Sequence, residues 1–487
     1  MNNLIKNELT KIFHKKALYV ILIIMVVLIF VGRLIDKFLY ENVEANELWE
    51  KEAVQTTIDS LDKSDPTYNE QLISLNSELE AIELSEKYDK NSWQTYLINN
   101  YGRDIIYKKN LSKGTDEYEE NKKKYDQFIE KLQNNDWKAF AQEELDEKNS
   151  EIEQLKATEN YDKETLAGLE DEKQVLTWRI EKNIEYGNDR NLGQALEDWK
   201  LERAQLRNYE NKEKNSGLTY SEKYQKQTAI QTLELYKYQI ENAIKDEELL
   251  SDEVGNYYIA TSADSGLATV FSQSSYGLFI IIATLIIAGT IVSEEFNKGT
   301  IKLLLVRPYK RTKILMSKFI TCLIVLAIMY VAVFLVQFVS GGIFDGFGNY
   351  NFKVAIYSFN TNSVETINVF KYMLLNGAGF LPLYVLLLTL AFALSTLFTN
   401  SAIAIALPLL GYMGSNIING FAYNYKKAEF LKFFVTPNWN LNVFLFGKIP
   451  QFEPISLPFS IAICLLYFMI MMVVSLIVFN KKEIKNI

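Results

Sequence analysis

The chain has little cysteine, histidine and proline, and each shortage excludes a class of protein. Its two cysteines, Cys322 and Cys464, both lie within apolar runs, so the long polar stretch between residues 36 and 275 has no disulfide framework. The single histidine, His14, provides neither a His/Cys metal cluster nor a catalytic triad. The polar stretch has one proline, Pro66, so we expect long helices that fold by packing alone.

Charge separates the chain into two kinds of sequence. Residues 36–275 carry 30 Lys and Arg against 52 Asp and Glu, a net charge of −22. Subtraction from the totals of 51 basic and 60 acidic residues leaves 21 and 8 in the flanks, a net charge of +13. These basic residues flank apolar runs and form no separate basic domain, so nucleic acid is not an expected partner.

Six apolar runs approach the roughly 20 residues that a helix needs to cross a bilayer. They cover residues 17–35, 276–293, 319–340, 376–398, 402–420 and 457–479. The first run is too long for a signal peptide, and Arg33 and Asp36 follow where a small-residue cleavage site would stand. We therefore expect six transmembrane helices, with 17–35 as the first and 276–480 containing the other five.

Positive charge in short loops marks the cytoplasmic side of a membrane. Lysines precede the first run and follow the last, and the loop between the second and third runs contains Lys298, Lys302, Arg307, Lys310, Arg311 and Lys313. This pattern predicts both termini in the cytoplasm of a bacterial cell, with 1–16 as an amphipathic interfacial helix and 481–487 as a tail. It also places residues 36–275 outside the cell.

The acidic stretch 36–275 shows the spacing of helical seams. Apolar side chains three or four residues apart, with one step of seven from Trp199 to Leu206, form three seams: Leu72, Leu75, Leu79 and Ile82; the weaker Leu192, Leu196, Trp199 and Leu206; and Leu233, Tyr236, Ile240 and Ile244. Turn residues predict breaks at 64–66, 113–114, 186–188 and 216–217. We expect an extracellular helical or coiled-coil domain, which serves either to capture a substrate or partner or simply as a solvated spacer.

The loop between the second and third runs, 294–315, has more than anchoring charge. Gly299 permits a sharp turn, and Pro308 is expected to start a new helix. Membrane anchoring would explain the cations, but not the pair Glu294 and Glu295 followed by Gly-Thr and Arg-Pro.

This loop, E-E-x-x-x-G-T-x-x-x-L-L-x-x-P-x-x-R-x-x-I-L-x-x-K, resembles the cytoplasmic loop of ABC-2-type exporter permeases. In that family the loop contains a coupling helix that rests in a groove of the ATPase subunit. The matching positions are Glu294, Glu295, Gly299, Thr300, Arg307, Pro308, Arg311 and Lys318. The resemblance extends over all six runs and the N-terminal segment, but not over 36–275.

The resemblance implies an all-α membrane protein that is the permease subunit of an exporter. Its implied partners are an ABC ATPase, a second permease that is identical or related, and membrane lipids. The sequence has no G-x-x-x-x-G-K-[ST] phosphate loop, so ATP and Mg²⁺ are expected on the ATPase, and this chain is expected to be no enzyme and to hold no cofactor or metal.

The last five runs have no Asp, Glu, Lys, Arg or His in their apolar cores, which argues against an ion-coupled carrier. Such a pathway suits a hydrophobic or amphipathic substrate such as an antimicrobial peptide, a lipid or a drug. The alternative is a surface scaffold or receptor that resembles phage-infection and type VII secretion accessory proteins. These also have one span, a long external coiled coil and five further spans.

Overall fold

The computed structural model describes residues 1–42, 47–187, 190–244, 249–251, 257–260, 277–302, 309–348, 352–424, 429–448, 450 and 455–482. The chain divides into two compact units. The membrane unit comprises Met1–Leu34, Asn208–Leu235 and Glu248–Ile487, and the helical unit comprises Ile35–Arg207 and Tyr236–Glu247.

The membrane unit contains five helices that are long and apolar enough to cross a bilayer. They are α2 (Lys16–Asn42), α13 (Gly277–Thr290) with its continuation α14 (Ser293–Asn297), α16 (Arg311–Asp345), α17 (Val369–Leu397) and α20 (Leu457–Lys481). The remaining predicted span, 402–420, falls on α18 (Ser401–Asn424), where the apolar stretch Ser401–Ser415 is shorter among the described residues. The prediction of a mostly helical membrane protein is therefore confirmed, and that of six spans is not.

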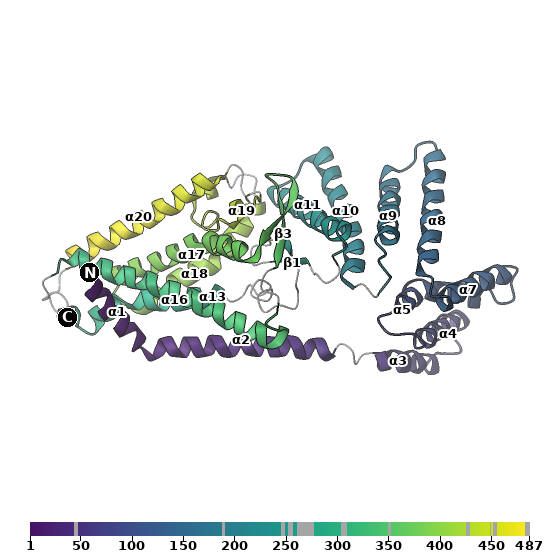
Figure 1. The fold of residues 1–487 in the computed structure, drawn as a ribbon, viewed down its shortest axis with the longest axis horizontal. Coiled ribbons are helices and arrows are strands. Elements are labelled where there is room, and N and C mark those ends of the chain that lie inside the picture. Colours follow the sequence, from purple (N-terminus) through teal and green to yellow (C-terminus); the bar gives the residue numbers. More distant parts are fainter. Residues whose placement is uncertain are drawn as a thin grey trace. The chain divides into compact units, whose positions relative to one another are not determined.

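Helices α13 and α17 form the centre of the membrane unit. Each is 61% buried along its span, whereas α2 is 17% and α20 is 22% buried. Figure 1 shows α13, α16, α17 and α18 side by side, and α13 contacts the other three. The central helices therefore face protein, whereas the outer helices leave apolar side chains exposed.

Small residues let the central helices approach closely. A Cβ on Gly289 of α13 would lie 2.6 Å from Cγ1 of Ile405 and 3.3 Å from the backbone carbon of Ala404, both in α18. Small residues favour this kind of contact between membrane helices, because lipid is as apolar as a leucine side chain and gives no hydrophobic drive for association.

Four short strands depart from the all-helical expectation. β1 (Leu249–Ser251), β2 (Tyr257–Ala260), β3 (Lys353–Ser358) and β4 (Ser363–Asn368) form an antiparallel sheet in this order. β3 is rich in β-branched and aromatic residues and is mostly buried, whereas β4 lies at the sheet edge and is mostly exposed. The strands bring the segment before α13 next to the segment before α17, which is a pairing that helical periodicity does not predict.

The helical unit is built from short and medium helices. They are α3 (Glu47–Asp59), α4 (Tyr68–Ser85), α5 (Trp93–Leu97), the π-helix η2 (Ile98–Gly102), α6 (Arg103–Leu111), α7 (Tyr118–Gln133), α8 (Trp137–Ala157), α9 (Lys163–Glu181), α10 (Arg190–Ser216) and α11 (Tyr220–Glu241). The last two continue into the membrane unit. One core of this unit gathers aromatic and aliphatic side chains, among them Trp93, Phe128, Trp137 and Tyr186.

All four predicted breaks between these helices are confirmed. Gly114, Gly187 and Gly217 have φ of +87°, +75° and +73°, the left-handed region that glycine enters without strain. Breaks at 134–136 and 158–162 were not predicted, although Asn135 and Asn160 also have positive φ and Asp136 and Asp162 cap the next helices. Asparagine followed by a capping aspartate was the signal.

The three predicted seams differ in how well they match burial. Leu192, Leu196, Trp199 and Leu206 are all buried, as expected. In the first seam only Ile82 is buried, because α4 packs through a neighbouring face that includes Ser77, Ala81 and Leu84. In the third seam Leu233 and Ile240 are buried, and Tyr236 and Ile244 are partly exposed.

Candidate functional site: the elbow after the second predicted span

The elbow, residues 290–302, is where α13 stops being a regular helix. The backbone N–H groups of Val292 and Ser293 donate to Oγ of Ser395 in α17, at 3.3 and 3.0 Å. Oγ of Ser293 donates to the carbonyl oxygen of Gly289 at 2.8 Å. An interrupted helix leaves backbone donors that would be costly to bury, and Ser395 satisfies two of them.

Gly299 turns the chain after the short helix α14. Its φ is +68°, and its N–H donates to the carbonyl oxygen of Phe296 at 3.1 Å. The predicted sharp turn is thus confirmed. A Cβ at this position would meet no described atom within 4 Å, so only the backbone angle requires glycine here.

Two of the predicted loop residues, Arg307 and Pro308, lie outside the described residues. The next helix, α16, begins at Arg311 rather than at Pro308, with Lys310 in an extended conformation before it. The guanidinium of Arg311 donates to the carbonyl oxygens of Asn480 and Lys482 at 3.0 and 3.1 Å. Arg311 therefore connects the start of α16 to the end of α20.

Glu295 lies in a charge cluster with Glu8, Lys11 and Lys318, of which Lys11 is 51% exposed and the other three are buried. Its Oε1 lies 2.7 Å from Nζ of Lys11 and 3.3 Å from Nζ of Lys318. The Thr300 hydroxyl donates to Oε2 of the same carboxylate. The Glu295 side chain is only 10% exposed, so these contacts within the chain occupy it.

Lys318 and Glu8 complete the charge cluster. Nζ of Lys318 lies 2.7 Å from Oε2 of Glu8, and the Lys318 side chain is fully buried. Nζ of Lys11 lies 3.4 Å from Oε1 of Glu8. Two carboxylates thus alternate with two ammonium groups, so the cluster as a whole carries no net charge.

The charge cluster holds three elements together. Glu8 and Lys11 belong to α1 (Asn2–Phe13), Glu295 to α14 and Lys318 to α16. Removal of one partner from a buried ion pair leaves an uncompensated charge that costs about 3–5 kcal/mol. The elbow, the N-terminal helix and the third predicted span are therefore electrostatically connected.

The N-terminal segment forms the helix α1, which has one buried face. Leu4, Glu8 and Ile12 are its buried residues, four positions apart and therefore on one face. Burial alone lowers the pKa of Lys11, but its hydrogen bond to Glu295 and the charge of Glu8 outweigh burial and raise this pKa. Lys11 therefore stays cationic at neutral pH.

Glu294 points to a more accessible environment than Glu295. Its Oε2 lies 3.1 Å from Nζ of Lys15 and 3.2 Å from Nζ of Lys298, and its side chain is 30% exposed. Nζ of Lys15 also donates to Oγ1 of Thr290 at 3.2 Å. Of the predicted glutamate pair, one is thus directed inward and one toward the surface of the elbow.

Sequence reasoning missed Glu8, Lys11 and Ser395 as parts of this site. Lys11 was interpreted only as cytoplasmic charge. A usable signal was Glu8 itself, an acidic residue on the apolar face of an amphipathic helix, which needs a buried cation. Among the residues that the structure describes, no group of three or more His, Cys, Asp or Glu could hold a metal ion.

Comparison with known proteins finds similar proteins whose descriptions give no role, one of which is described as a membrane protein. A family described as "Protein of unknown function (DUF2705)" matches residues 249–485. The "Uncharacterized protein YhcI" of Bacillus subtilis (strain 168) is 28% identical over 267 residues, which are 53% of this chain and 84% of that protein. The "Uncharacterized membrane protein YdbK" of the same organism is 29% identical over 213 residues, 43% of this chain and 80% of that protein. No solved structure matches. Together with the five apolar helices, these similarities identify a multi-pass membrane protein.

Proposed function

We propose that this chain is the permease subunit of an ATP-binding-cassette exporter, driven by a separate ATPase subunit that binds ATP and Mg²⁺. The observation that carries the proposal is the elbow. A loop with the family's pattern is attached through Glu295 to the N-terminal helix and to α16. A displacement of this loop by a partner would therefore move both elements together.

The exposed part of the elbow provides the contact surface for the ATPase. Glu294, Lys298 and Thr300 are at least partly exposed, and Gly299 lets the backbone turn between them. In this proposal Glu294 faces the partner, whereas Glu295 and Lys318 transmit the movement inside the membrane unit. Arg307 and Pro308 belong to the same loop of the sequence.

The proposal retains the predicted topology and partners. The termini and the elbow lie in the cytoplasm, residues 36–275 lie outside, and a second permease completes the pathway. The substrate is hydrophobic or amphipathic, because the predicted spans have few ionisable residues.

The test is co-expression of the chain with an ABC ATPase that is encoded in the same genome and co-purifies with the unmodified chain. Glu294→Lys and Gly299→Val should both reach the membrane at normal levels, because the first makes the loop more basic and the second strains only one turn. Both should lose co-purification of the ATPase, or lose substrate-stimulated ATP hydrolysis by about tenfold, equivalent to roughly 1.4 kcal/mol.

The matched control is Lys6→Glu, a charge reversal at an exposed position of α1. It should leave ATPase binding and hydrolysis unchanged. If both elbow variants bind the ATPase and transport normally, the loop is only a membrane anchor, and the surface-scaffold alternative becomes the better explanation.

A further inference from the structure

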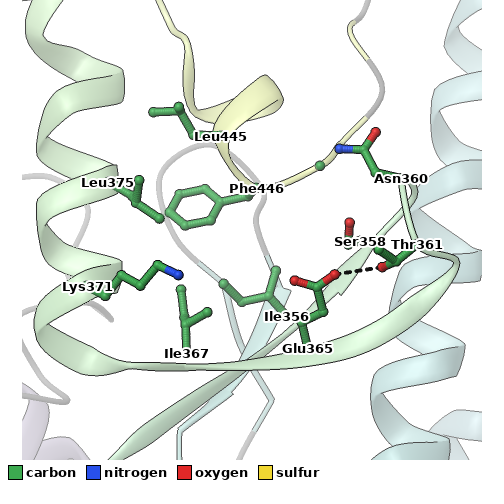
Figure 2. Close-up of a pocket in the computed structure, with 11 residues that line it drawn as sticks. Ile356, Ser358, Asn360, Thr361, Glu365, Ile367, Lys371, Leu375, Leu445 and Phe446 are labelled. Carbon is green, nitrogen blue, oxygen red and sulfur yellow. Dashed lines mark hydrogen bonds between the residues drawn. The ribbon is translucent and has the colours of Figure 1, made fainter.

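The membrane unit has a second polar site, distant in sequence from the elbow, at the start of α17. A pocket of about 260 Å³ lies between the β3–β4 hairpin, α17 and the segment after α19 (Asn442–Leu445). Its apolar lining consists of Ile356, Ile367, Leu375, Leu445 and Phe446, and its polar lining of Ser358, Asn360, Thr361, Glu365 and Lys371, with Gly447 at one wall. Figure 2 shows these side chains.

Two opposite charges lie at this pocket without neutralising each other. In Figure 2 the ammonium of Lys371 and the carboxylate of Glu365 are separated by the side chains of Ile356 and Ile367. Oε1 of Glu365 accepts one hydrogen bond, from the Thr361 hydroxyl at 2.7 Å. Within the described part of the chain, neither charge has an ion-pair partner. The pocket therefore presents one ammonium group and one carboxylate, with apolar side chains between them.

The walls of the pocket are preformed. The rings of Tyr372 and Phe446 stack with centroids 4.9 Å apart, and Tyr372 is fully buried. The N–H of Phe359 donates to the carbonyl oxygen of Gly447 at 2.9 Å. Gly447 has φ of +65°, and a Cβ there would lie 2.4 Å from Oγ of Ser358. A ligand would therefore bind with little ordering of the protein.

The pocket lies at a membrane boundary. Helix α17 has 29 residues and is therefore about 43 Å long, which exceeds the roughly 30 Å of bilayer hydrocarbon. Lys371 is its third residue and so falls in the headgroup region. Next to it on the helix, Phe370 is 53% and Leu374 is 76% exposed. An apolar surface thus continues from the charged pocket along the helix into the lipid.

We propose that this pocket binds the head group of a zwitterionic phospholipid that carries a primary ammonium. The lipid ammonium donates to the carboxylate of Glu365, its phosphate accepts from Lys371, and an acyl chain lies along Phe370 and Leu374. The volume is below the 300–1,000 Å³ of pockets for drug-sized ligands, which suits a head group rather than a whole lipid. The inference goes beyond the exporter proposal and does not depend on an ATPase.

The test uses the purified full-length chain in detergent, with phosphatidylethanolamine, phosphatidylcholine and phosphatidylglycerol added separately and bound lipid counted by native mass spectrometry. Phosphatidylethanolamine should be retained about tenfold better than phosphatidylcholine, whose quaternary ammonium has no N–H to donate. Glu365→Gln should make these two lipids equal. Lys371→Gln should lower the retention of both, because both have a phosphate.

The control is Lys353→Gln, at an exposed position of β3 outside the pocket, which should change nothing. Equal retention of phosphatidylethanolamine and phosphatidylcholine by the unmodified chain would overturn the proposal. So would an unchanged preference in Glu365→Gln, unchanged retention in Lys371→Gln, or preferential retention of phosphatidylglycerol. If free phosphoethanolamine displaces the lipid at equal concentration, the site binds a soluble phosphoamine and the lipid assignment is wrong.

Discussion

The membrane unit and the helical unit both bury ion pairs, Lys318 with Glu8 in the first and Arg207 with Asp171 in the second, but the helical unit also holds a carboxyl group whose partner is a tyrosine hydroxyl. In the membrane unit, Lys318 and Glu295 are inside the protein and are neutralised by ion pairs with other elements. In the helical unit, Glu144 accepts a hydrogen bond from the Tyr186 hydroxyl at 2.6 Å, and the guanidinium of Arg179 lies 4.0 Å from the Tyr186 ring centroid.

The difference shows that the groups around a buried charge decide how the cost of burying it is offset. Apolar helices offer few dipoles, so a buried charge there needs a full counter-charge. The aromatic core of the helical unit offers hydroxyl groups, and burial raises the pKa of Glu144 despite those bonds and the charge of Arg179. Burial therefore shifts the pKa of Glu144 upward, whereas Lys318 is held between two carboxylates.

The largest effect is expected from Lys318→Met, which removes the fully buried cation from the charge cluster. Glu8 and Glu295 then share only Lys11, and we expect a loss of about 3 kcal/mol of stability. The measurement is the thermal midpoint of the full-length protein in detergent, read as loss of monodisperse material. Lys313→Met, at an exposed position of the same helix, should have little effect.

A second variant sharpens this prediction. Lys318→Met combined with Glu8→Gln removes one carboxylate and leaves Glu295 with Lys11. The double variant should be more stable than Lys318→Met alone, because the two changes are coupled. If the two changes in unfolding free energy simply add, the charges of the cluster do not stabilise one another. The account of buried ion pairs in the membrane unit would then be wrong.

An intermediate effect is expected from Gly289→Val, which tests the close packing of α13 against α18. The new Cβ would meet Ile405 and the backbone of Ala404, and overpacking of this kind costs about 1–3 kcal/mol. Gly411→Val is the matched control, since a Cβ at Gly411 meets nothing within 4 Å. Equal thermal midpoints for the two variants would mean that α18 does not pack here.

The smallest effect is expected from Glu144→Gln. Because the raised pKa makes the native state hold a proton that the unfolded chain releases, stability from this group is greatest at acidic pH. It falls as pH rises from the ordinary carboxyl range through the raised pKa. Glutamine keeps an oxygen that can accept from Tyr186 and removes this pH dependence. The slopes of unfolding free energy against pH should therefore differ between variant and unmodified chain by at most the equivalent of about one bound proton.

Hydrogen exchange in α8 can measure this difference. The ratio of exchange rates between variant and unmodified chain, taken at each pH, cancels the intrinsic pH dependence of exchange. Glu147→Gln, at an exposed position on the same helix, should give a flat ratio. A flat ratio for Glu144→Gln as well would show that Glu144 is ionised like a surface carboxylate.

The sequence by itself determined most of the secondary structure. Apolar runs of about 20 residues identify membrane helices wherever they stand, since the cost of exposing backbone to lipid leaves few alternatives. The turn glycines at 114, 187, 217 and 299 were predicted for an equally local reason, because their positive φ depends on the residue itself. The loop pattern around Glu294 and Glu295 likewise needed no coordinates.

Only the tertiary structure decided which residues act together. Glu8 and Lys318 are 310 positions apart, and nothing in local periodicity pairs them. The β2–β3 pairing and the support of the elbow by Ser395 are of the same kind. Each depends on a contact between distant segments, whose partner is chosen by the packing of the whole unit and not by the residues beside it.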